Sequence, residues 1–209
     1  MNLTQVSTID ANFPCDIFFK QDTVPSLAIE AGKDTEQVVS EIAGHTLKLR
    51  LNEESSERIK VFITLQNLEE LHLENTNFVT VSKLNAKDLK IHLIGTVILY
   101  MNVDAKVLHF EGKGDIAASF EGRIDEQIVQ LAGPSFKYLA KEALSTKVTL
   151  DGGDKDMASA ENKRTITLNT DEAHITRCGS KTTIFFDHKP TVLDNNSLAE
   201  LSFGSEESA

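Results

Sequence analysis

The sequence lacks tryptophan and contains only two tyrosines, so the large side chains of its interior must come from eleven phenylalanines and from leucine, isoleucine and valine. It has only two cysteines, Cys15 and Cys178, which lie far apart and form no Cys-x-x-Cys pair. A structural zinc site is therefore not expected. One long-range disulfide is compatible with this spacing, and two buried free thiols are the favoured interpretation.

Basic residues are also scarce. The chain has 21 Lys and Arg against 32 Asp and Glu, a formal net charge of −11, and its longest basic run is Lys163-Arg164. An acidic chain without a basic patch repels the phosphates of nucleic acids and the anionic surface of a membrane. We therefore expect no nucleic-acid partner.

Long apolar runs are absent as well. None approaches the roughly 18 residues that a transmembrane helix needs, so we expect no transmembrane segment. Residues 1–20 show no basic stretch followed by an apolar stretch, which is the pattern of a secretory signal. Two options follow: a cytoplasmic protein, or a chain that begins after a removed leader.

What the sequence does contain is a series of triplets with two apolar outer residues. They are Leu71-His72-Leu73, Ile91-His92-Leu93, Leu108-His109-Phe110, Val129-Gln130-Leu131, Val148-Thr149-Leu150, Ile166-Thr167-Leu168, Ile184-Phe185-Phe186 and Leu201-Ser202-Phe203. The third residues are numbers 73, 93, 110, 131, 150, 168, 186 and 203, so successive ones lie 17 to 21 residues apart. Strict alternation predicts half-buried strands, and a recurrence near every 19 residues is typical of a solenoid.

The predicted fold is therefore all-β, a solenoid of short coils of about 19 residues whose apolar residues form shared columns. Glycines after several triplets, such as Gly95 and Gly133, suit sharp corners between its faces. A β-sandwich whose strands alternate by chance is the alternative. The spacing of apolar residues in 135–144 also allows a short helix that interrupts one coil.

The domain organisation predicted is one continuous domain in three parts. Residues 1–65 form a non-repeating β region that caps the solenoid, residues 66–205 form the repeats, and residues 206–209 form an acidic tail. A short helix from Asp34 to Ile42 is expected within the cap, with Asp34 as its N-cap. The strands expected there lie near 5–10, 15–20, 25–30, 45–51 and 58–65.

The chain resembles the family of auto-transporter adhesins with a head GIN domain, from about Phe13 to Ser205. The matching segments are Asp16–Gln21, Thr46–Leu51, Val61–Leu71, the serial triplets with their glycine turns, and Ile184–Val192. The family's Ser-Gly-Ala-Gly-Asn turns are degenerate here, as in Glu111–Asp115. The resemblance implies a right-handed β-helix-like fold and a cell-envelope or secreted location, and it transfers no catalytic residue.

Three histidines fill the middle positions of consecutive triplets: His72, His92 and His109. In the predicted register they form an outward column with neighbours about 5 Å apart. Such imidazoles could share a transition-metal ion, and a solvated surface column is the alternative. If like charges face one another, protonation should be resisted, and the folded state should lose stability as the pH falls through about 6.5.

A second candidate site is the acidic turn that contains Asp151, Asp154 and Asp156. Three carboxylates beside two glycines could bind calcium through oxygen ligands. The turn lacks the spacing of an EF-hand loop, and an ordinary solvated turn is the alternative.

No nucleophile-elbow, zinc-protease, phosphate-loop or dinucleotide motif is present, so we expect a non-enzyme without a cofactor. The leading hypothesis is an adhesin-like envelope or secreted protein that binds a glycan or protein surface through one flat face. One alternative is a glycan-active enzyme. In the predicted register Glu74, Glu111, Asp151 and Asp187 share an outward column, but they lie about 10 Å apart, which is too wide for a retaining glycosidase pair. The other is a structural homo-oligomerisation module. The outward apolar residues that would serve it are Ile94, Val107, Ile128 and Phe185.

Overall fold

The computed structural model describes residues 2–53, 57–152 and 164–204, and almost all of its regular structure is β-strand. The all-β prediction is therefore confirmed. The strands are β1 (Thr8–Asn12), β2 (Asp16–Gln21), β3 (Ser26–Glu30), β4 (Val38–Ala43), β5 (Thr46–Leu51), β6 (Lys60–Leu65), β7 (Glu70–Glu74), β8 (Phe78–Asp151), β9 (Arg164–Thr176), β10 (Thr182–Phe186), β11 (Val192–Asn196) and β12 (Glu200–Phe203).

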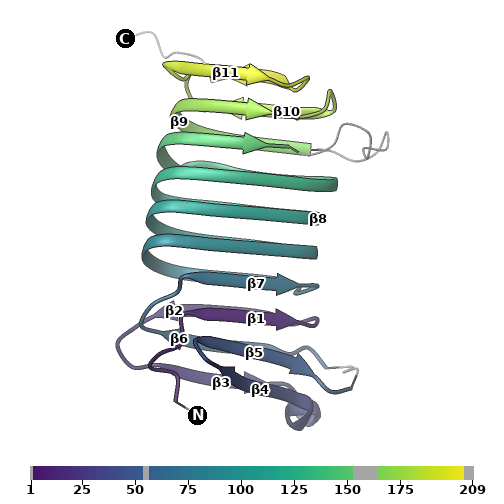
Figure 1. Ribbon diagram of the computed structural model, residues 1–209. Coiled ribbons are helices and arrows are strands. Elements are labelled where there is room, and N and C mark those ends of the chain that lie inside the picture. The colour runs from purple at the N-terminus through teal and green to yellow at the C-terminus, as the bar shows by residue number, and fades with distance from the viewer. Residues whose placement is uncertain (1, 54–56, 153–163, 205–209) are drawn as a thin grey trace.

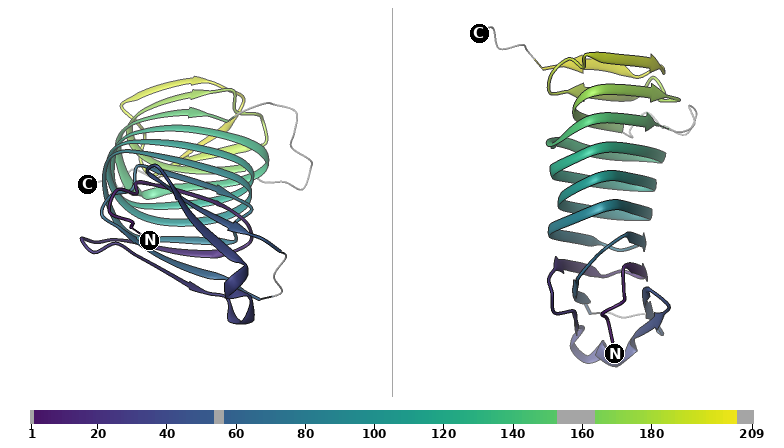
Figure 2. Two further views of the ribbon diagram at one scale, coloured as in Figure 1. Left: turned by 60° about the horizontal axis from the view of Figure 1, so that its bottom comes forward. Right: turned by 60° about the vertical axis from the view of Figure 1, so that its left-hand side comes forward.

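These strands form a single 12-stranded sheet with both parallel and antiparallel pairs, which curves until it nearly closes on itself. The long element β8 winds around the molecule in successive passes, and these passes stack one above another (Figures 1 and 2). Residues 19 apart in β8 are in contact: Asn102 donates a hydrogen bond to Glu121, and the Arg123 amide donates to Asp104.

One side of this stack, which we call the first face, contains β5, β1, β7, passes of β8, the second half of β9, and β11. All of these pairs are parallel and in register. Ile9 lies beside Leu71, Leu71 beside Ile91, and, further along, Val148 lies beside Ala173. Alternate residues of each strand therefore point into the core, where Ile9, Leu71 and Ile91 are fully buried.

A second face contains β6, β2, the beginning of β8, residues 136–140 of β8, the first half of β9, β10 and β12. Phe18 lies beside Phe62, Ile166 lies beside Tyr138, and Ile184 lies beside Ile166. The last three triplets belong to this face: Ile166-Thr167-Leu168 pairs with 138–140 and not, as predicted, with 148–150. The prediction was wrong here because both faces show the same alternation, and sequence spacing does not distinguish them.

The core between the faces contains an aromatic cluster. The rings of Phe110, Phe120 and Tyr138 lie 5.1 to 5.7 Å apart, and all three side chains are buried. The buried Tyr138 hydroxyl donates a hydrogen bond to Gln127 Oε1 at 2.5 Å, and Gln127 in turn donates to Ser145. These hydrogen bonds give the buried side chains of Tyr138, Gln127 and Ser145 polar partners within the core.

The expected helix from Asp34 to Ile42 is not present. A short 3-10 helix spans Gly32–Gln37, and from Val38 the chain forms β4, which pairs antiparallel with β5. Pairing with the edge of β5 suits the β-branched Val38, Val39 and Ile42 better than an isolated helix of two turns.

The short helix considered for 135–144 is also wrong, because this segment is part of β8. Phe136, Tyr138 and Ala140 alternate into the core as strand residues do. The register with β9 shifts between Ala140 and Leu144, and this irregularity brings Ala143 onto the buried side as well. A β-bulge therefore produced the spacing that suggested a helix.

The N-terminal strands lie close to their predicted positions, and two of them extend the first face. In β1 and β5, Asp10 and Lys48 point outward between buried apolar neighbours, in register with His72. Among the described residues, no helix combines the length and apolar character needed to cross a bilayer.

Candidate functional site

The candidate site is a strip of polar side chains on the outside of the first face, centred on His72, His92 and Glu111. We call it the histidine strip. Its central residues alternate with buried ones such as Leu71 and Leu93, so the strand period fixes their outward direction. The side chains that flank them on neighbouring outward positions are Glu70, Lys90, His109 and Lys113.

His72 and His92 are directly paired across β7 and β8, as the sequence predicts. Their ring centroids are 6.0 Å apart and the rings meet edge to face at 70°.

His109 does not extend this column. The position next to His92 is occupied by Glu111, whose Oε2 lies 3.0 Å from His92 Nδ1. His109 lies two residues earlier, with its Nε2 3.6 Å from Asp88 Oδ1. The prediction was wrong because it counted Leu108-His109-Phe110 as the third triplet, whereas the segment in register with 91–93 is Phe110-Glu111-Gly112. Gly112 has no apolar side chain to mark the position, and the ring of Phe110 lies against it.

Acidic side chains lie beside two histidines of this strip, His92 and His109. His92 lies between Glu111 and Glu70, whose Oε1 is 3.7 Å from His92 Nε2. Lys113 Nζ lies 2.5 Å from Glu111 Oε1. Hydrogen bonds from Lys113 and then from His92 lower the pKa of Glu111 below its usual value. Carboxylates, and not a third imidazole, therefore lie beside His92.

Two shallow hollows lie on either side of the pair His92 and Glu111. The hollow toward His109 has a volume of about 220 Å³ and includes Ile128 and Gln130. The hollow toward His72 has a volume of about 280 Å³ and includes Ile94 and Lys113. Two of the outward apolar residues noted in the sequence thus lie within the strip, whereas Phe185 lies on the second face. The strip thus combines hydrogen-bond donors, acceptors and small apolar side chains on its exposed side.

No group of three or more His, Cys, Asp or Glu side chains is arranged to hold a metal ion within residues 2–53, 57–152 and 164–204. The geometry therefore gives the predicted transition-metal site no support. Of the calcium candidates, Asp154 and Asp156 lie outside the described residues. Asp151 accepts a hydrogen bond from Arg177 Nε at 3.0 Å, and the calcium site stays a prediction.

The four carboxylates considered for an enzyme do not share a column. Glu74 lies beside Ile94, and Glu111 lies in the His92 column. Asp187 follows β10 on the second face, where its Oδ1 lies 3.3 Å from Lys141 Nζ. Asp151 and Glu111 line one hollow of about 210 Å³, with Lys113 and Arg177 beside them.

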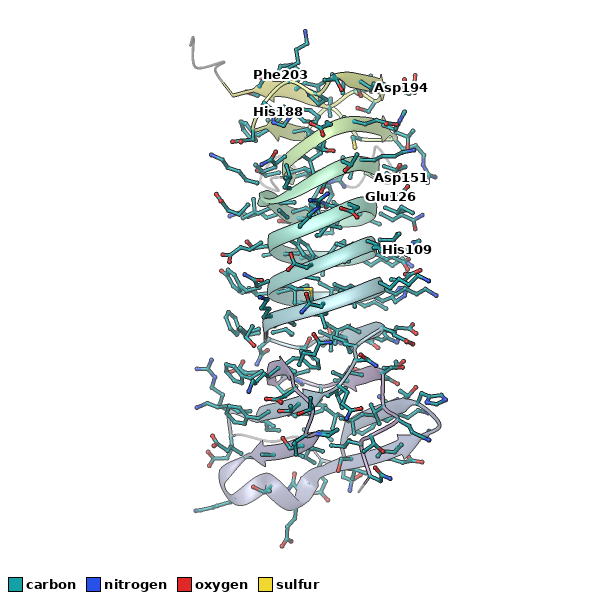
Figure 3. All side chains as sticks on the ribbon, turned by 90° about the vertical axis from the view of Figure 1, so that its left-hand side faces the viewer. His109, Glu126, Asp151, His188, Asp194 and Phe203 are labelled. Atoms are coloured by element: carbon teal, nitrogen blue, oxygen red, sulfur yellow. The ribbon has the colours of Figure 1, made fainter. Side chains whose placement is uncertain are left out.

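Sequence reasoning missed one member of the strip's column, His174. It lies beside Thr149 and Asp194 in the first-face register, 2.5 Å from Glu172 Oε1 through Nε2. This contact is the main cause of the lowered pKa of Glu172. The signal was present in Ala173-His174-Ile175, which alternates like the other triplets but begins with a small residue. Figure 3 shows His109, Asp151 and Asp194 along one side of the molecule, away from His188 and Phe203.

The two cysteines are free and buried. Burial raises the pKa of Cys15 to about 12 and that of Cys178 to about 11. Thiols with such pKa values carry almost no thiolate at neutral pH, so neither is a candidate nucleophile.

Comparisons with known proteins agree with this architecture. A putative adhesin from Bacteroides fragilis superposes with a TM-score of 0.74 at 17% identity, over 95% of this chain and 91% of its own. A putative lipid binding protein from Parabacteroides distasonis superposes with a TM-score of 0.64 at 15% identity, over 98% of this chain and 95% of its own. A putative adhesin from Parabacteroides merdae superposes with a TM-score of 0.62 at 14% identity, over 96% of this chain and 92% of its own.

No curated protein sequence matches the chain significantly. Residues 6–175 match the family described as "Putative auto-transporter adhesin, head GIN domain". The chain therefore belongs to this head GIN domain family, as its resemblance indicated.

Proposed function

We propose that this protein is a non-catalytic component of the cell envelope, or a secreted protein, that binds an extended ligand along the histidine strip. In this proposal the stacked passes form a right-handed β-solenoid with coils of about 19 residues. Contacts between residues 19 apart in β8 and the parallel register of the first face support it. The envelope location rests on the family.

The observation that carries the proposal is the regular arrangement of the strip. Side chains in one column repeat at the strand spacing of about 4.8 Å, so donors and acceptors lie in rows along the stack. His72, His92 and Glu111 form one row, and Glu70 and Lys90 occupy paired positions beside it. A glycan chain or a flat protein surface is long enough to contact several strands at once, whereas a small metabolite would contact only one hollow.

Binding of the labelled full chain to an array of bacterial and host glycans tests this function. The double variant His92→Gln, Glu111→Gln should lose at least about tenfold in affinity for any glycan bound by the wild type, since it removes the carboxylate and the imidazole that would bond to the ligand. The matched control is Lys106→Gln, an exposed change away from the strip. Equal binding by wild type and double variant would reject the strip as the binding site.

The same array separates binding from catalysis. Reducing-sugar release is measured on each bound glycan after prolonged incubation. A binder leaves the glycan intact, whereas an enzyme with clustered carboxylates would produce new reducing ends. Release that depends on Glu111 would overturn the non-catalytic proposal.

A further inference from the structure

The C-terminal end of the stack presents two open strand edges. β12 pairs only with β10, and β11 pairs only with β9, among the strands that the structure describes. β11 belongs to the first face and β12 to the second, so both faces end at this end of the molecule (Figure 1). Each open edge carries backbone N–H and C=O groups that can pair with another strand.

These edge strands carry only some of the features that usually prevent pairing: both are short, and each has one acidic residue, Asp194 in β11 and Glu200 in β12. The segments Val-Leu-Asp-Asn-Asn of β11 and Glu-Leu-Ser-Phe of β12 contain no lysine, arginine or proline. A lysine or proline on an edge is a common device against association between sheets.

The core is also left partly uncovered at this end. Phe203 stacks on Phe186 with ring centroids 5.4 Å apart and is still 40% exposed; among the described residues, Phe186 is the only ring stacked on it. Leu201 is half-buried in the same strand, and Leu198, just before it, is 59% exposed. Apolar side chains that extend a core column are thus available to a partner.

We propose that a second copy of this chain covers this end, so that two molecules associate end to end about a twofold axis perpendicular to the stack. Under this symmetry β12 pairs antiparallel with β12 of the partner, and β11 pairs antiparallel with its counterpart. A single peptide strand can satisfy only one of the two edges. A second copy of the same end offers both edges at the required separation, because twofold contacts are self-complementary.

The other end of the molecule fits this contact less well. There β3 and β4 run antiparallel to the strands that they cover, and the helix Gly32–Gln37 lies beside them. The described side chains of this helix are polar and mostly exposed, including Lys33, Thr35 and Glu36. Head-to-tail contact would place Leu201 and Phe203 against this polar segment, whereas the twofold contact places them against each other.

The oligomeric state in solution tests the proposal. Light scattering after size exclusion, over about a hundredfold range of concentration, should show the mass rising from that of the 23.0 kDa chain to a plateau at twice this value. Phe203→Lys should shift the dissociation constant at least tenfold toward monomer. Leu144→Lys, at a position of similar exposure in the last part of β8, should leave it unchanged.

A cysteine cross-link gives a second test that does not depend on stability. Ser202→Cys places a thiol in the centre of β12, and oxidation should yield a covalent dimer. The control Thr167→Cys lies in the same outward column, two strands inward, and should stay monomeric. A monomer at every concentration, or mass growth without a plateau, would overturn the twofold proposal, as would equal cross-linking of both variants.

Discussion

His92 Nδ1 lies 3.0 Å from Glu111 Oε2, and the two residues are 19 positions apart in the chain. This contact links two successive passes of β8 on the outside of the first face. Lys113, two residues after Glu111 in the same pass, forms an ion pair with the same carboxylate. The local charge balance of the strip therefore depends on Glu111, and its protonation should be measurable.

The first prediction concerns acid stability. Because the pKa of Glu111 is lower in the folded state, its stabilising contribution is fully present above the usual carboxyl value and is lost as the pH falls through the lowered value. Glu111→Gln should thus cost about 0.5 kcal/mol at pH 7 and nearly nothing at pH 2 to 3. Urea unfolding at both pH values measures the difference.

The cause of this pKa shift can be tested separately. The hydrogen bond from Lys113 is the largest cause, followed by that from His92. The Glu111→Gln change should therefore cost less free energy of unfolding at pH 7 when Lys113 is already replaced by Gln. The same background change at His92 should reduce this cost by a smaller amount. A larger effect of His92→Gln would contradict this order.

The second prediction concerns the close stacking of passes at Gly114. Gly114 has a φ of 121°, and a Cβ there would collide with the carbonyl oxygen of Gly95 in the neighbouring pass. Gly114→Ala should lower the free energy of unfolding by about 2 to 4 kcal/mol, since strain and collision add.

Gly44→Ala provides the control for this substitution. Gly44 also has a positive φ, of 63°, but no atom lies within 4 Å of a Cβ built there. Gly44→Ala should lower the free energy of unfolding in urea by only about 1 kcal/mol. Equal costs at the two positions would show that the passes are not packed as tightly as described.

The third prediction concerns the buried chain from Tyr138 to Ser145. Tyr138→Phe removes the hydroxyl that donates to Gln127 and leaves a buried amide oxygen without this partner. It should cost about 1 to 3 kcal/mol in thermal or urea unfolding. Tyr100→Phe, at a side chain that is 50% exposed, should change stability by less than about 0.5 kcal/mol.

The fourth prediction concerns the thiols. Burial and the raised pKa values of Cys15 and Cys178 should prevent both from reacting with a thiol reagent at pH 8 in the native protein. Both should react in urea, so the count of modified thiols rises from zero to two. Rapid modification of native protein would place at least one thiol in an accessible position.

Alternation in the sequence predicted the strands of this molecule well, because half-buried strands must repeat every two residues. It predicted the pairing of His72 with His92 for the same reason. The alternation failed at Gly112, which has no apolar side chain to mark it as a core position; the side chains of Leu131 and Phe110 occupy the space beside it. It failed again after Leu150, where triplets of two different faces have nearly equal spacing and only tertiary pairing assigns them.

The helix predicted from Asp34 shows a different limit. Local capping signals favoured a helix, but pairing of β4 with β5 provides six residues with partners along an otherwise open edge. Tertiary hydrogen bonding therefore overrode local preference. A β-bulge near Ala140 had the opposite effect, since it imitated helical spacing within a strand.

The parallel register of the first face also bears on how such chains diverge. Only the inward position of each column must remain apolar, while its outward neighbour faces solvent and is free to vary. The putative adhesin from Bacteroides fragilis accordingly shares the fold over 95% of this chain with only 17% of residues identical. Natural selection can therefore replace the outward side chains of the strip, one row at a time, without changing the buried residues that hold the strands together.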